Sequence, residues 1–325
     1  MRSGFVLIFA LLLAACSPGA GASDSLNVVA INPILGDVVS RVGGEHVQVT
    51  VLIPAGTDPH AFEVTPQDAA KIAEADLVVI NGLGLEASLE AFLHDAEEAG
   101  RVVIASDGVV PLEFEDAHEH EDEHEHEGEE HDHEGEEHDH EGEEHGHHHE
   151  GEDPHVWMNP LNVITWVDNI AAALTAADAA NAAAYQANAE AYKASLTELD
   201  DWIAQQVAEV PVSSRQLVTD HESFNYFAQR YGFEIVGALI PSFSTLSEIS
   251  AGELAELEET ITAHNVPAIF VGASINPSLA ERVSTDTGVA LVILYGETLS
   301  ASDGPAPNYI DMMRYNVSSI VDALR

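Results

Sequence analysis

Short runs of β-branched and other apolar residues alternate with segments of helical periodicity along the first third of the chain. The apolar runs predict buried strands at residues 28–31, 47–53, 77–80 and 102–104. Between them, the pattern predicts helices at residues 33–42, 66–75 and 85–99. The second of these helices has Thr65 as its cap and Pro66 at its first position. Such alternation is typical of βαβ units with a mostly parallel sheet.

A long Ala-rich stretch with few helix breakers follows at residues 159–209 and ends before Pro211. It predicts helical structure almost throughout, with a break near residues 176–181. The stretch is too long for one crossover helix, so we expect it to connect two domains.

The strand–helix alternation then starts again. It predicts strands at residues 217–219, 235–239, 268–271 and 291–294, and helices at residues 223–231, 251–264, 278–287 and 309–324. The expected fold class is α/β, and 325 residues suffice for two domains. We expect two similar domains with mostly parallel sheets, at residues 26–158 and 211–325, joined by a helical linker at residues 159–210. Ligands of open α/β sheets bind beyond the carboxyl ends of strands, which places the expected site in the cleft between the domains.

Four polar segments lie at strand ends or at a domain junction. They are Gly-Thr-Asp-Pro-His60, Asp-Pro-His155, Thr-Asp-His221 and Tyr-Gly-Glu297. Pro fixes the backbone before the first two histidines, and Asp can cap the turn or accept a hydrogen bond from the imidazole. A single loop histidine is ordinarily a surface residue, but the repeated Asp-Pro-His triplet and the shared placement make these four residues candidate metal ligands.

Three further histidines, His46, His94 and His264, lie outside such contexts. We expect them to be ordinary surface or hydrogen-bonded residues.

The charge is extreme: 57 Asp and Glu against 10 Lys and Arg give a formal net charge of −47. Nucleic-acid binding through phosphate contacts needs a basic surface, so that class of function is excluded, and so is a polybasic membrane-surface protein. Residues 113–153 hold 22 of the acids and 12 of the 18 histidines, with no Lys or Arg. The acidity therefore has two parts, an unusual insert and a generally acidic remainder.

The insert contains a repeat of seven residues that starts at His126, and its polar composition predicts disorder. A helix is disfavoured because Gly recurs within a dense run of like charges. A purely solubilising loop would explain the acids but not the histidines, and His-rich tracts are typical of metal binding. We therefore expect a metal-collecting segment whose ligands are His118, His120, His124, His126, His131, His133, His138, His140, His145, His147, His148 and His149.

The N-terminus combines Arg2, an apolar run at residues 5–13 and the sequence Leu-Ala-Ala-Cys16. This pattern predicts a secretory signal peptide at residues 1–15. Leu-Ala-Ala-Cys resembles the lipobox of bacterial lipoproteins, which implies cleavage before Cys16 and a lipid on its thiol, followed by a tether at residues 16–25. The alternatives are an ordinary signal peptide or a buried N-terminal helix with a chance cysteine. A single cysteine excludes an intrachain disulfide.

The segments at residues 56–66, 153–160, 221–232 and 294–300 read GTDPHAFEVTP, DPHVWMNP, HESFNYFAQRYG and LYGETLS. Together they resemble the metal-binding subunits of the high-affinity zinc and manganese ABC importers, the cluster A-I substrate-binding lipoproteins. The resemblance covers nearly the whole mature chain. It implies two similar α/β domains linked by a long rigid helix, with metal in the interdomain cleft. It also implies His60, His155, His221 and Glu297 as ligands, and an ABC permease with its ATPase subunit as partners.

The third ligand separates the two branches of that family. Manganese-type members have a carboxylate where this chain has His221, whereas zinc-type members have His. Three imidazoles also suit Zn²⁺ chemically, while Mn²⁺ prefers more oxygen ligands. The fourth position varies among zinc-type members, some of which rely on water or a different acid, so water stays open there and Glu63 and Glu222 are rival carboxylates. We predict Zn²⁺, with manganese or another divalent metal as the alternative.

Two other classes of function stay open. Three histidines with an open position also occur in zinc hydrolases, but no motif places a second carboxylate as general base. A surface adhesin is the other class, because exported lipoproteins can serve at the cell surface. We expect a monomeric binding protein that is not an enzyme, exported to the extracytoplasmic face and held at the membrane through its lipid anchor alone.

Overall fold

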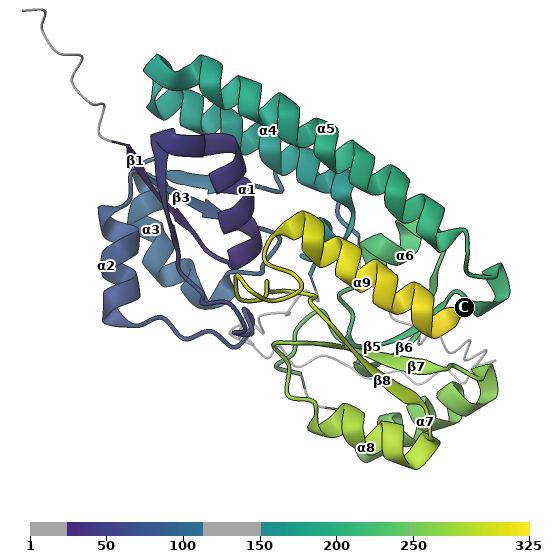
Figure 1. The fold of residues 1–325 in the computed structure, drawn as a ribbon. Helices are drawn as coiled ribbons and strands as arrows, with labels where there is room; N and C mark the ends of the chain where they lie inside the picture. The colour runs from purple at the N-terminus through teal and green to yellow at the C-terminus, as the bar shows by residue number, and fades with distance from the viewer. Residues whose placement is uncertain (1–24, 113–150, 248) are drawn as a thin grey trace, which may run out of the picture.

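Each half of the chain builds a four-stranded parallel sheet in the computed structural model, which describes residues 25–112, 151–247 and 249–325 (Figure 1). The N-terminal sheet has the order β2-β1-β3-β4, and the C-terminal sheet has the matching order β6-β5-β7-β8. The strands are β1 (Leu26–Ala30), β2 (Val47–Val51), β3 (Leu77–Ile80), β4 (Val102–Ile104), β5 (Gln216–His221), β6 (Glu234–Ile240), β7 (Ala268–Gly272) and β8 (Ala290–Leu294). The shared strand order confirms two similar α/β domains.

Several expectations from the sequence lie outside the described residues. They are the signal peptide at 1–15, Cys16 with all but the last residue of the tether, and the insert at 113–150 with its twelve histidines. The exact domain boundaries stay a prediction.

The N-terminal domain contains α1 (Pro33–Gly43), α2 (Pro66–Glu74) and α3 (Glu90–Glu98). The expected start of α2 is confirmed: the Thr65 hydroxyl accepts from the Asp68 N–H in a capping box, and Pro66 occupies the first position. The helix predicted at residues 85–99 is shorter, because residues 87–89 form a separate 3₁₀ turn before α3.

The C-terminal domain contains α6 (Asn225–Tyr231), α7 (Ala251–His264), α8 (Ser278–Thr287) and α9 (Tyr309–Leu324). Strand β5 extends through His221, so this residue ends the strand instead of following it. Helix α6 accordingly begins at Asn225 and not at Ser223, whose backbone N–H donates to the His221 carbonyl in a tight turn.

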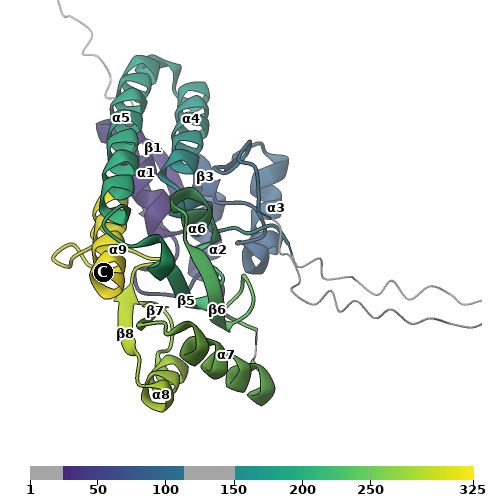
Figure 2. The ribbon, with the colours of Figure 1, turned by 90° about the vertical axis from the view of Figure 1, so that its right-hand side faces the viewer.

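The Ala-rich stretch folds as a helical hairpin, with α4 (Pro160–Ala177) and α5 (Ala182–Val207) side by side in both views (Figures 1 and 2). The predicted break is confirmed at Asp178, whose carboxylate accepts hydrogen bonds from Asn181 and Tyr185. The long connecting helix is α5, whose 26 residues span about 39 Å at 1.5 Å per residue. It packs against α1 in one domain and α9 in the other.

A continuous apolar core runs through both domains along this hairpin. It includes Val28 of the first sheet, Ile203 of α5, Phe270 of the second sheet and Met313 of α9. Separate clusters cover the outer faces: α2 and α3 pack on the first sheet, and α7 and α8 on the second. Because the two domains share one core, we expect them to behave as a nearly rigid unit.

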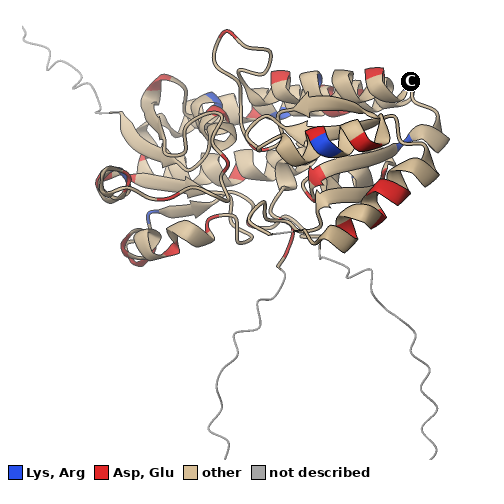
Figure 3. Cartoon of the chain, turned by 90° about the horizontal axis from the view of Figure 1, so that it is seen from below, with Lys and Arg blue, Asp and Glu red and all other residues tan. Residues whose placement is uncertain are grey.

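Asp and Glu far outnumber Lys and Arg along the described chain (Figure 3). Among the helices in the described part of the chain, none is sufficiently long and apolar to cross a membrane.

Candidate metal centre

The carboxyl ends of the two sheets meet at one site, to which each domain contributes two residues. His60 lies in the loop after β2, and His155 precedes the 3₁₀ turn that leads into α4. His221 is the last residue of β5, and Glu297 follows β8. The site therefore lies where the open-sheet rule places ligands, between two domains.

One carboxylate oxygen contacts all three imidazoles. Glu297 Oε1 is 2.8 Å from the Nε2 atom of His60 and 3.2 Å from the Nε2 atoms of His155 and His221. The His155 Nε2 atom is 3.4 Å from that of His60 and 3.3 Å from that of His221. One ligand atom from each of the four residues lies within 4.8 Å of the others.

The site is closed to solvent. The side chains of His155, His221 and Glu297 are at most 2% exposed, and that of His60 is 7% exposed. The second carboxylate oxygen of Glu297 is buried without a hydrogen-bond partner in the described residues. A buried carboxylate oxygen without a partner is costly, and a cation bound among these side chains would remove that cost.

Two aspartates orient the imidazoles of their own motifs. Asp153 Oδ1 lies 2.7 Å from His155 Nδ1, and Asp220 Oδ1 lies 2.9 Å from His221 Nδ1. A proton held on Nδ1 leaves Nε2 with its lone pair directed into the site, as a metal ligand requires. Asp220 is itself fixed by the Gly272 N–H, which donates to its Oδ2 at 2.6 Å.

The His60 loop is shaped by Gly56 and Asp58. Gly56 has a positive φ of 81°, which an L side chain rarely adopts, and its N–H donates to the Thr298 hydroxyl at 2.7 Å. Asp58 Oδ1 accepts from the His60 N–H at 2.9 Å. The same Asp-Pro-His arrangement recurs at Asp153, which accepts from the His155 N–H. The repeated triplet therefore forms the same local turn twice.

Both domains hold the backbone around His155. Trp157 Nε1 donates to the Gly296 carbonyl at 2.7 Å, and the Tyr309 hydroxyl donates to the Trp157 carbonyl at 2.6 Å. On the other side, Asn81 Nδ2 donates to the Pro154 carbonyl at 3.0 Å. These contacts preorganise His155 from the end of β3 and from the C-terminal domain.

The charge of the site favours a cation. Burial disfavours the charged forms of His155 and His221, yet their carboxylate partners outweigh it and raise the pKa of both imidazoles, that of His221 well above 6.5. Burial likewise opposes ionisation of Glu297, but His221 and His60 hold its pKa well below 4.5. Without metal, the fold thus stabilises protons on His155 and His221 beside an ionised carboxylate.

The nitrogen spacing fits a small tetrahedral metal site. Zn–N bonds of about 2.0–2.1 Å at tetrahedral angles place two nitrogens about 3.3–3.4 Å apart. The two close Nε2–Nε2 distances, 3.3 and 3.4 Å, match this spacing.

The other acidic and histidine candidates lie elsewhere. Glu63 is exposed, and neither it nor Glu222 belongs to the cluster that the described residues form. His94 is exposed beside Glu98, His264 contacts the Gln216 amide, and His46 packs edge-on against Tyr185. The sequence patterns include Asp220 and Thr298 only as parts of longer motifs and give neither a role of its own.

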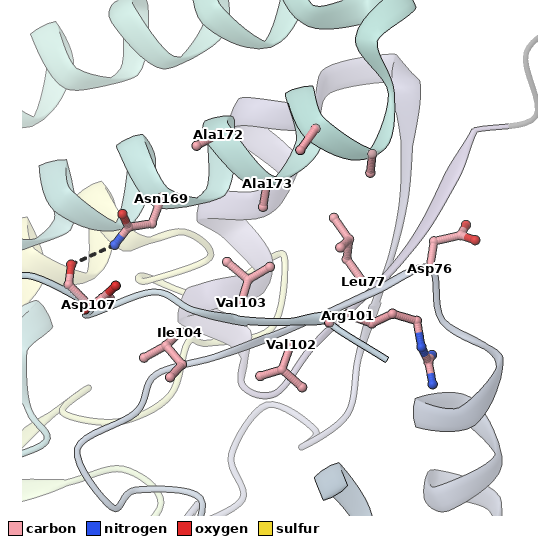
Figure 4. Close-up of a pocket in the computed structure, with 13 residues that line it drawn as sticks. Asp76, Leu77, Arg101, Val102, Val103, Ile104, Asp107, Asn169, Ala172 and Ala173 are labelled. Atoms are coloured by element: carbon pink, nitrogen blue, oxygen red, sulfur yellow. Dashed lines mark hydrogen bonds between the residues drawn. The ribbon is translucent and has the colours of Figure 1, made fainter. Parts of the chain in front are cut away.

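A separate groove of about 620 Å³ opens between β4 and α4 (Figure 4). Apolar side chains such as Val102, Ile104 and Ala173 line it, with Arg101 at one end. None of the four clustered residues contributes to this groove.

Comparisons with known proteins identify metal-binding relatives. The family model described as "Zinc-uptake complex component A periplasmic" (ZnuA) matches residues 28–323. The manganese-binding lipoprotein MntA of Halalkalibacterium halodurans is 30% identical over 325 residues, covering 98% of this chain and 96% of the relative. The manganese ABC transporter substrate-binding lipoprotein PsaA of Streptococcus pneumoniae is 30% identical over 328 residues, covering 98% of this chain and 95% of the relative.

Solved structures share the same fold. The periplasmic zinc binding protein TroA from Treponema pallidum matches with a TM-score of 0.78 and 25% identity, covering 92% of this chain and 99% of that chain. A manganese-bound periplasmic metal binding protein from Candidatus Liberibacter asiaticus matches with a TM-score of 0.73 and 27% identity, covering 93% of this chain and 100% of that chain. The names of these similar proteins include two different metals, manganese and zinc.

Proposed function

The chain belongs to the family of the periplasmic zinc-uptake complex component A, and we propose that it captures Zn²⁺ outside the cytoplasm and delivers it to an ABC-type permease. Proteins of this family bind metal for transport and are not enzymes. The permease would be driven by an ATPase subunit, and high-affinity zinc uptake would be the physiological result.

The observation that carries the zinc proposal is the donor set. Three imidazole nitrogens and one carboxylate oxygen converge in a buried cluster. The coordination chemistry of Zn²⁺ favours such nitrogen-rich, four-coordinate sites, whereas Mn²⁺ favours more oxygen ligands. His60, His155 and His221 would bind as neutral imidazoles, and Glu297 would contribute the negative charge.

Binding on this scheme exchanges protons for metal. Zn²⁺ displaces the protons that the metal-free site holds on its imidazoles, while Asp153 and Asp220 keep the Nδ1 protons in place. These two carboxylates, together with Asp58 and Glu297, also give the cleft a negative potential that attracts divalent cations.

Manganese is the second candidate, because MntA and PsaA carry it in their names. Titration of metal-free protein with each metal, in competition with a chelator of known affinity, separates the two. We expect Zn²⁺ to bind at least about 100-fold more tightly than Mn²⁺, since Zn²⁺ lies well above Mn²⁺ in the affinity order for such ligands. Equal or tighter binding of Mn²⁺ would overturn the zinc proposal.

Two expectations from the sequence extend this function. We propose that Cys16 carries a lipid anchor and that the histidines of residues 113–153 collect Zn²⁺ beside the cleft. Deleting residues 117–152 should lower both the number of Zn²⁺ ions bound and zinc uptake when zinc is scarce. If both stay unchanged, the collecting role is wrong.

A further inference from the structure

The loop after β6, described at residues 241–247, connects the His221 side of the candidate site to the His60 side. At its base, the Glu222 N–H donates to the Ser242 carbonyl at 3.0 Å, next to His221. Hydroxyl groups within the loop fix its shape: Ser242 Oγ accepts from the Ser244 N–H at 3.1 Å and contacts Ser247 Oγ at 3.0 Å. Residues 241–247 of this loop extend from the C-terminal domain towards the His60 loop of the N-terminal domain.

The tip of the loop makes a hydrogen bond between the domains. The Thr245 hydroxyl donates to Asp58 Oδ2 at 2.7 Å, while Asp58 Oδ1 accepts from the His60 N–H at 2.9 Å. One carboxylate therefore connects Thr245 to the backbone of a metal-ligand candidate. An ionised acceptor makes this hydrogen bond stronger than a neutral pair would be.

His60 differs from the other two histidines in how it is held. Asp153 and Asp220 each use one oxygen for both the backbone N–H and Nδ1 of their own histidine. Asp58 instead divides its oxygens between the His60 backbone and Thr245 of the other domain. His60 is also the most exposed of the three imidazoles, with 7% of its side chain accessible. Of the three aspartates, Asp58 is thus the one whose carboxylate accepts a hydrogen bond from the other domain in the described residues.

We propose that Thr245 is a positioning residue for metal retention. Its hydroxyl holds Asp58, and through Asp58 it keeps the His60 loop closed on the metal. Breaking this contact opens the loop and sets the rate at which metal leaves. The inference rests on the proposed metal-binding function and adds to it the residue that controls release.

The test measures the rate at which Zn²⁺ dissociates from the full-length protein. The zinc-loaded protein is mixed with excess chelator in a stopped-flow instrument. Thr245→Val keeps the side-chain shape but removes the hydroxyl, and we expect Zn²⁺ to dissociate roughly tenfold faster, with association changed less than about twofold. Thr245→Ser restores the hydroxyl and should release Zn²⁺ at nearly the wild-type rate. The matched control is Thr262→Val on the exposed face of α7, whose hydroxyl bonds within its own helix, and it should leave the rate unchanged.

A double-mutant cycle with Asp58→Asn tests the route of the effect. If Thr245 acts through Asp58, then Asp58→Asn combined with Thr245→Val should release Zn²⁺ no faster than Asp58→Asn alone. Wild-type release by Thr245→Val, or fast release by Thr245→Ser, would overturn the inference even though the wild type binds Zn²⁺. Absence of Zn²⁺ binding by the wild type would instead refute the proposed function.

Discussion

Aspartates determine how the imidazoles of the site present their nitrogens. Asp153 and Asp220 lie against Nδ1 of His155 and His221, so Nε2 of each ring is directed at Glu297. Because the aspartates are buried with their histidines, each imidazole is held in a fixed orientation.

Asp153→Asn should therefore weaken Zn²⁺ binding by about 10–100-fold without unfolding the protein. The amide cannot supply the negative charge that makes the His155 ring a better donor. Isothermal titration of metal-free protein measures the change, with Asp286→Asn on the exposed part of α8 as the control. Unchanged affinity in Asp153→Asn would contradict this role.

The site also makes a pH-dependent contribution to the stability of the metal-free protein. The raised pKa of His221 stabilises the fold fully below its ordinary value of 6.5, and this contribution is lost as pH rises through the raised pKa. The lowered pKa of Glu297 stabilises the fold fully above pH 4.5, the ordinary pKa of Glu. This contribution is lost as pH falls through the lowered pKa. The contribution of these two groups to stability is therefore greatest between pH 4.5 and pH 6.5.

We expect the melting temperature of metal-free protein to fall as pH rises from about 6 to about 8. Over the same interval, the increase in melting temperature caused by saturating Zn²⁺ should become larger. Thermal unfolding with a chelator and with Zn²⁺ measures both. Glu297→Gln should flatten the metal-free dependence. An increase from Zn²⁺ that shrinks as pH rises would refute the proton–metal exchange.

At the residue scale, the sequence predicted the cluster but not its cross-domain contacts. His60 and His155 were recognisable because a rare triplet occurs twice, and Glu297 because it follows the last strand of the second domain. Thr245 lies 187 residues from Asp58 and belongs to a Ser- and Thr-rich loop without a motif. Its contact depends on how the two domains are placed, which local sequence patterns do not encode.

At the element scale, α5 connects the domains and fixes their relation. Asp200 of α5, 6% exposed, accepts from Arg230 of α6 at 2.9 and 2.6 Å and from the Tyr231 hydroxyl at 2.8 Å. Periodicity predicted helices on both sides of residue 178, but not that the second would pack back along the first. Both helices contribute apolar side chains to the shared core, such as Trp166 of α4 and Leu196 of α5.

Asp200→Asn should lower the free energy of unfolding of metal-free protein by about 1–3 kcal/mol, because a buried tyrosine hydroxyl and a guanidinium lose their ionised acceptor. Urea unfolding measures the loss. Asp201→Asn is the matched control, since this neighbouring carboxylate is exposed, and it should change stability by less than about 0.5 kcal/mol. A similar effect of both substitutions would show that the contact between α5 and α6 contributes little.

At the scale of the whole molecule, a shared core joins two sheets whose carboxyl ends meet at the candidate metal site. A core that runs through both domains disfavours wide opening of the cleft, so we expect metal exchange to depend on the loops at its mouth. The hydrophobic pattern predicted the two α/β domains well, because strand and helix periodicities are local. It did not predict the distances among the four side chains of the cluster, which come from distant parts of the chain.

In the proposed function, His60, His155, His221 and Glu297 together bind Zn²⁺. The most direct measurement is a crystal structure of protein loaded from equal amounts of Zn²⁺ and Mn²⁺, with anomalous diffraction recorded on both sides of the zinc absorption edge. We predict one strong zinc signal, bonded at about 2.0–2.1 Å to Nε2 of each histidine and to a Glu297 oxygen. A manganese signal at this position, or an ion that these side chains do not bind, would contradict the proposal.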